Sequence, residues 1–231
     1  GGPYALTVSD VLVDDFQKTA VALYGDGMTV DVDNVTTIGE GPTDVTAQNG
    51  IAIGYGASGT FDNCDISDVY WTGETWTASG FMALNEGFVT ANDVDMDGCQ
   101  TSLYVQDYSG SFDGTDVTNP YGDALYAYST GAKAEGPRLL PSPFEAGGTG
   151  GGAKAAVSVT LTNGTFTGTG AVDSWGPTAY GYGPLTFTVT DCEVTNWDWG
   201  IVLYDFDGAS FDADVTGCNI HGNTSYGMYS N

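Results

Sequence analysis

Apolar and polar residues follow two patterns that recur along this 231-residue chain. The first is a phrase of four residues: Asp, Asn or Gly, then a small residue, a polar residue and an aliphatic residue. Its second positions lie 21 to 30 residues apart, except for one interval of 54. A period in the twenties predicts a solenoid, because one such repeat cannot bury its apolar face without neighbours. The copies begin at Asp10, Asn34, Asn63, Asp93, Gly114, Gly168, Asp191 and Gly217.

The second pattern is an aliphatic and aromatic run that ends in a Gly/Asp turn and leads into an alternating segment. Alternation with a period of two indicates a strand that has one polar face. We therefore expect two or three short strands in each repeat of about 25 residues. The apolar runs are 21–27, 51–56, 81–87, 103–107, 124–128 and 201–205, and the clearest alternating segments are 28–33, 185–190 and 211–216.

Short strands at this spacing resemble the right-handed parallel β-helix (β-solenoid) family. The resemblance implies an all-β fold of about eight turns in a single domain, residues 1–231, with like residues stacked one strand spacing apart in ladders. One implied ladder contains Phe61, Phe112, Phe166 and Phe211. A β-sandwich also has many short strands, but its strands would not carry the same phrase once per repeat.

The interval of 54 residues contains an insertion at about 131–156 that is rich in Pro and Gly. It has two interpretations. It is a flexible surface loop, or it is a cationic arm that docks on the acidic flank of a neighbouring molecule. The arm would use the charges of Lys133, Arg138 and Lys154 and an apolar anchor of Leu139, Leu140 and Phe144.

The net charge of -26 limits the partners that this chain can have. Nucleic acids and anionic membranes need cations on the protein, and no stretch approaches the roughly 20 apolar residues of a membrane span. Scarce Lys, abundant Asp and Thr, and four Cys favour an extracellular protein of the cell envelope. Three sequons for glycan attachment, at Asn34, Asn163 and Asn223, fit this location.

The cysteines are disulfide candidates without a unique pairing. Cys64, Cys192 and Cys218 share one position of the repeat, where the alternative role is that of a small apolar residue, and Cys99 lies outside it. Four cysteines allow three intramolecular pairings, and intermolecular bridges are equally compatible with the sequence. We expect no zinc site, since no CxxC spacing is present, and no cofactor beyond calcium bound loosely by clustered Asp.

Catalytic residues are not expected, although many parallel β-helices are polysaccharide lyases or hydrolases. Glycoside hydrolysis needs two carboxylates, and Asp95/Asp97, Asp205/Asp207 or Asp212/Asp214 could supply them, but 24 Asp make such pairs common. His221-Gly222 lacks the later Arg-x-Lys of the polygalacturonase pattern, and a basic residue for a lyase is limited to Arg138. The corner Trp197-Asp198-Trp199 is a sugar platform, a subunit contact or ordinary packing.

The strand pattern runs from residues 5–8 to 226–231 without a capping helix. Exposed strand edges template further pairing, so either the sequence is a fragment or copies of the chain cover each other's ends, in a head-to-tail contact. We expect an extracellular structural protein that assembles into a sheath, surface layer or fibre. In composition and architecture it resembles secreted acidic archaeal cell-surface and sheath proteins. The alternatives are a secreted carbohydrate-active enzyme and a glycan-binding adhesin.

Overall fold

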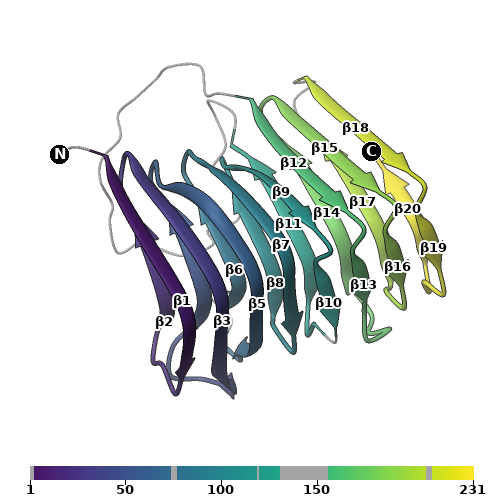
Figure 1. Cartoon of the computed structure of the whole chain (residues 1–231). Helices are drawn as coiled ribbons and strands as arrows, with labels where there is room; N and C mark the ends of the chain where they lie inside the picture. Colours follow the sequence, from purple (N-terminus) through teal and green to yellow (C-terminus); the bar gives the residue numbers. More distant parts are fainter. Residues whose placement is uncertain (1–2, 74–76, 119, 131–155, 207–209) are drawn as a thin grey trace.

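The computed structural model describes residues 3–73, 77–118, 120–130, 156–206 and 210–231, which form strands and turns without a helix (Figure 1). All strand pairs in this part of the chain are parallel. The expected all-β fold is confirmed, and the antiparallel β-sandwich is excluded. The described residues contain no helix long and apolar enough to cross a membrane.

The strands form two sheets. Sheet one has twelve strands: β1 (Tyr4–Asp14), β3 (Met28–Thr43), β5 (Ser58–Trp71), β7 (Phe88–Asp97), β9 (Ser109–Asp113), β10 (Asp116–Thr118), β12 (Val157–Thr162), β13 (Thr165–Thr167), β15 (Leu185–Thr190), β16 (Glu193–Thr195), β18 (Phe211–Thr216) and β19 (Asn219–His221). Sheet two has eight strands: β2 (Thr19–Tyr24), β4 (Asn49–Gly54), β6 (Ser79–Leu84), β8 (Thr101–Gln106), β11 (Asp123–Ser129), β14 (Trp175–Gly181), β17 (Trp199–Asp205) and β20 (Tyr226–Ser230).

The chain alternates between the two sheets, and each strand pairs with its counterpart one repeat later. We call a segment of sheet one and the following strand of sheet two a rung. Figure 1 shows the first described rung, β1 and β2, at one end of the molecule and the last described rung, β18 to β20, at the other. This parallel, alternating arrangement fits the expected solenoid.

A corner with left-handed backbone recurs in each rung of sheet one. Its residues stack in one column: Asp10, Asn34, Asn63, Asp93, Gly114, Asn163, Asp191 and Gly217, with φ between 51° and 67°. Asn, Asp and Gly adopt this conformation at the lowest cost, which explains the first position of the repeated phrase. The amide of Asn34 also donates a hydrogen bond to Asp10 Oδ1 at 2.7 Å, and the amide of Asn163 donates one to Asp113 Oδ1 at 2.7 Å.

One copy of the phrase was wrongly placed. Asn163, not Gly168, occupies the corner column, since Phe166 pairs with Val117 on one side and with Val194 on the other. The sequences Asn163-Gly164-Thr165 and Gly168-Thr169 are similar in composition. Only the strand register, which composition does not reveal, shows which of them forms the corner.

The core lies between the sheets, and its columns mix large and small residues. Phe61 and Phe112 share a column with Ala91 between them. Phe81 from β6 packs edge-on against both rings, with centroids 4.9 Å and 6.0 Å away. The expected ladder of four Phe residues is therefore wrong: Phe166 and Phe211 belong to other columns, and alternation of size lets the two sheets interdigitate.

The insertion lies outside the described residues, except for Ala156. The strands on either side of it are nevertheless in direct register. β9 pairs with β12, and β11 pairs with β14, although residues 131–155 separate them in the sequence. The two sheets and one continuous apolar cluster therefore extend across the insertion.

We predict that Asn63→Val is less stable than Asn63→Gly. Asn63 has φ of 52° and donates to Asp33 Oδ1 at 3.1 Å, so both variants lose this hydrogen bond. Only the β-branched variant also strains the left-handed corner, which costs about 1–3 kcal/mol. Urea unfolding of both variants measures the difference, and equal midpoints would show that the corner does not need a left-handed residue.

Candidate functional site

The clearest candidate site is the pair of end rungs, where columns that are buried elsewhere become accessible. One inward column runs from Val8 in β1 to Val215 in β18. Its six middle members are at most 1% exposed: Val32, Phe61, Ala91, Phe112, Leu161 and Val189. Val8 and Val215 pack on the core but are only partly buried. Each inward column therefore needs a further rung at both ends to become fully buried.

Larger apolar side chains at the end rungs are more exposed. Tyr4 and Leu6, in columns that are buried in the middle of the chain, are 57% and 38% exposed in the first described rung. Met228, which stacks on the buried Ile201, is 53% exposed in the last described rung. Exposed apolar side chains that continue buried columns make the end rungs a candidate interaction site.

The backbone of the end rungs also has a free edge. Among the described residues, β1 pairs with β3 alone and β2 with β4 alone, while β18 pairs with β15 and β20 with β17. An unpaired parallel edge presents a row of N–H and C=O groups that another strand can satisfy. Among the described strands, β1 and β2 form the edge at one end of the two sheets, and β18, β19 and β20 form the edge at the other end.

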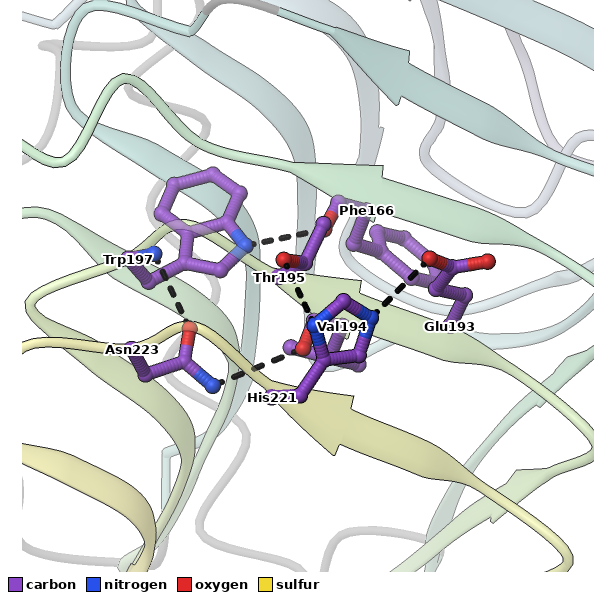
Figure 2. Close-up of polar contacts among 7 residues, drawn as sticks. All are labelled: Phe166, Glu193, Val194, Thr195, Trp197, His221 and Asn223. Carbon is purple, nitrogen blue, oxygen red and sulfur yellow. Dashed lines mark hydrogen bonds and ion pairs between the residues drawn. The ribbon is translucent and has the colours of Figure 1, made fainter.

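His221 lies on the last described rung and is held by the rung below it. Its Nε2 lies 3.2 Å from Glu193 Oε1, and its Nδ1 lies 3.5 Å from Thr195 Oγ1 (Figure 2). In the same region the Asn223 side chain accepts from the Trp197 backbone at 2.9 Å and donates to the Val194 carbonyl at 3.4 Å. The contacts with Glu193 and Thr195 hold the imidazole of His221 on the polar, outward side of sheet one.

Acidic side chains gather at one further place on sheet one. Asp65, Asp95 and Asp116 occupy successive rungs of one outward column, next to Asp97. They line a depression of about 340 Å³. Desolvation, and after it the charges of Asp116 and Asp65, raise the pKa of Asp95. The described residues contain no cluster of His, Cys, Asp and Glu suited to hold a metal ion.

The other predicted acidic pairs do not form a comparable group. Asp212 and Asp214 are exposed on the last described rung, and Asp205 is exposed while Asp207 lies outside the described residues. His221 contacts Glu193 rather than an Asp pair. Of the predicted acidic pairs, Asp95 and Asp97 line the depression described above.

All four cysteines are free thiols in the structure, so disulfide reinforcement receives no support from it. Cys64 and Cys192 are buried members of one inward column, which Cys218 continues at partial exposure, and Cys99 is buried at a corner outside it. Burial raises the pKa of Cys64 and of Cys192 to about 11 and that of Cys99 to about 12. Buried thiols that are neutral in this way pack as small apolar residues.

The outward side of sheet two differs from that of sheet one, because it is aromatic. Tyr126 stacks on Tyr180 with centroids 4.7 Å apart, and Tyr180 stacks on Tyr204 at 5.1 Å. A separate apolar cluster of Ala52, Met82 and Tyr104 lies on the same side. Successive rungs thus extend aromatic contacts along the sheet, and the ring faces are occupied by other rings.

The Trp corner contributes to this packing. Trp197 is buried and donates through Nε1 to the Phe166 carbonyl at 3.0 Å. Trp199 contacts Trp175 at 5.9 Å and Tyr226 at 4.7 Å. Sugar stacking needs a free ring face, so the arrangement favours packing over a sugar platform.

The remaining predicted sites are placed as follows. The amide nitrogens of Asn34, Asn163 and Asn223, the three sequon positions, already donate hydrogen bonds within the fold, and glycan attachment stays a prediction. The proposed cationic arm, with Lys133, Arg138, Lys154, Leu139, Leu140 and Phe144, lies outside the described residues.

One carboxyl group beside the aromatic side of sheet two was not recognised from the sequence. Desolvation raises the pKa of Asp123 to about 7, opposed by a hydrogen bond from the Trp175 backbone. Asp123 is the first residue of β11, where it pairs with Trp175 of β14 and Thr101 of β8. A sequence with 24 Asp gives no signal that singles out this one.

We predict that Asp123 lowers stability as the pH rises. Its folded pKa lies above the usual value of 3.8, so the folded state binds the extra proton between about pH 4 and 7 and loses that stabilisation over this window. Relative to Asp123→Asn, the parent chain should lose roughly 2–4 kcal/mol from pH 4 to pH 8. Urea unfolding at several pH values measures this, and parallel stability curves would contradict it.

Comparison with known proteins adds no further constraint on the site. No protein-family model, curated protein or solved structure matches this chain. The candidate sites therefore stand on the geometry of the described residues: the end rungs, the acidic depression and the aromatic side of sheet two.

Proposed function

We propose that this chain is an extracellular structural protein that assembles end to end with its own copies into a sheath, surface layer or fibre of the cell envelope. In this proposal the strands wind as a right-handed parallel β-helix of about eight turns. The single observation that carries it is that both end rungs combine free parallel strand edges with accessible apolar columns.

The residues of the first and last described rungs are the two ends of the same columns, so the two rungs have matching apolar and polar positions. A contact between the last rung of one copy and the first rung of the next is heterologous, so it repeats without limit unless it closes into a ring. The described strands of the two end rungs pair in parallel, and a parallel joint continues the same hydrogen-bond pattern. This supports a fibre or tube over a closed dimer.

The charge of the chain opposes assembly and sets its conditions. Copies that each carry a net charge of -26 repel one another. Salt screens this repulsion, with a Debye length of about 10 Å at 0.1 M, and calcium bound loosely by exposed Asp reduces it further. Assembly should therefore strengthen with ionic strength, and the acidic surface keeps the polymer hydrated.

We predict that Leu6→Asp prevents assembly while Leu12→Asp leaves it nearly unchanged. Both leucines lie in β1, and both changes add one negative charge, but Leu6 belongs to an inward column and Leu12 to an outward one. Burying an unpaired carboxylate at the joint costs several kcal/mol. Leu6 is already 38% exposed, so the fold of the single chain should be little affected.

Sedimentation velocity and electron microscopy over a concentration series at about 0.15 M salt measure the assembly of both variants and the parent chain. The parent chain and Leu12→Asp should form elongated particles, and Leu6→Asp should remain monomeric. A parent chain that stays monomeric throughout the series, or equal assembly of the two variants, would overturn the proposed function.

A second candidate function, polysaccharide hydrolysis, is favoured by the acidic depression. Desolvation, and after it neighbouring charges, raise the pKa of Asp95, while Asp65, Asp97 and Asp116 supply neighbouring carboxylates. A proton donor beside a carboxylate is the pair that glycoside hydrolysis requires. This candidate is the weaker one, because stacked carboxylates also arise from an ordinary solvated acidic face.

We expect any hydrolase activity to depend on Asp95 and not on Asp31, an exposed carboxylate of the same sheet outside the depression. Release of reducing ends from a panel of neutral polysaccharides is the measurement. If the depression is catalytic, Asp95→Asn should lower the rate by at least about 100-fold, and Asp31→Asn should match the parent chain. No release from any polymer by the parent chain would exclude the candidate for that panel.

A further inference from the structure

We propose that the joint between copies has one fixed register, in which His221 of one copy faces Asp14 of the next. This inference rests on the proposed function and specifies its contact. His221 ends a column that Asp14 begins, through the uninterrupted pairings of Ile38, Ser67, Asp97, Thr118, Thr167 and Thr195. The next copy continues this column by one rung.

The left-handed corner fixes the register. Asp10 in the first described rung has φ of 54°, and Gly217 in the last has φ of 67°. A rung that stacks with its corner displaced would place an extended strand on a bend and break the parallel hydrogen bonds. Alignment of Gly217 with Asp10 therefore determines which residues meet along the rest of the joint.

The apolar columns match in this register. Phe211 would meet Tyr4, Val215 would meet Val8, and Ile220 would meet Val13, in columns that are apolar through most of the chain. On sheet two, Met228 would meet Val21 in the same way. The joint thus buries the side chains that the end rungs leave accessible.

The charges also match, which is notable for a chain of this acidity. Inside the chain, carboxylates stack directly on one another, as Asp33 does on Asp62 and Asp65 does on Asp95. At the joint no outward pair in sheet one would combine two carboxylates. The pairs are Asp212 with Ala5, Asp214 with Thr7, Thr216 with Ser9, Gly217 with Asp10, Asn219 with Leu12, and His221 with Asp14.

Residues of the preceding rung fix the position of the His221 imidazole, so its place at the joint is defined. Glu193 and Thr195, both in the preceding rung, contact the two ring nitrogens of His221 (Figure 2). Both groups are polar and accessible, so the imidazole stays at the surface of the last described rung. Asp14 of the next copy would lie on the other side of the imidazole, so that His221 separates this carboxylate from that of Glu193.

A charge exchange tests this contact. His221→Asp should raise the critical concentration for assembly about tenfold, because it places two carboxylates together at the joint. Adding Asp14→Lys in the same chain creates an opposite-charge pair and should return the critical concentration to within about threefold of the parent. Thr167→Asp is the matched control, since it adds the same charge to the same column away from the joint, and it should assemble like the parent.

Carbodiimide coupling identifies the contact directly. His221→Lys places an amine at this site, and coupling of a mixture of isotopically light and heavy chains distinguishes links between copies from the link to Glu193 within one copy. Mass spectrometry should find the introduced amine joined to Asp14 of a differently labelled chain. Links only to other carboxylates, or no rescue by Asp14→Lys, would overturn the register while polymers still form. Absence of polymers in the parent chain would instead contradict the proposed function itself.

Discussion

The structure depends on in-register stacking of parallel rungs. No rung can bury its apolar side chains alone, because it contributes only one segment to sheet one and one strand to sheet two. Val32, Phe61 and Ala91 are fully buried since each has a neighbour on both sides, whereas Val8 and Val215 have one neighbour and stay partly exposed. The same physical requirement thus produces the core in the middle of the chain and the accessible surface at its end rungs.

Stacking also brings like charges together, and the neighbours of the carboxylates differ between the middle of the chain and its end rungs. Parallel register brings like residues within one strand spacing of each other, about 4.8 Å. In the middle, Asp65, Asp95 and Asp116 lie together at a depression, where desolvation, and after it the charges of Asp116 and Asp65, raise the pKa of Asp95. In the register proposed for the joint, each outward carboxylate of sheet one in the first and last described rungs would face a side chain that is not a carboxylate.

The two sheets have different outward sides: that of sheet one is polar and that of sheet two is aromatic. Sheet one is polar outside, with Thr, Ser and Asp in its columns, and its depression and His221 are both accessible. Sheet two has stacked rings outside, where Tyr180 contacts Tyr126 and Tyr204. These rings satisfy one another along the sheet, so they stabilise successive rungs rather than leaving free faces for a ligand.

The sequence by itself determined the class of fold and the repeat. The Asp/Asn/Gly corner is visible in the sequence because left-handed backbone restricts residue type, and period-two alternation is visible because side chains of a strand alternate between two faces. Register was decided only by the tertiary structure, since it depends on hydrogen bonds between residues far apart in the chain. For this reason the sequence misplaced the corner at Gly168 and joined Phe166 and Phe211 to the wrong column, and it could not single out Asp123 or the match between His221 and Asp14.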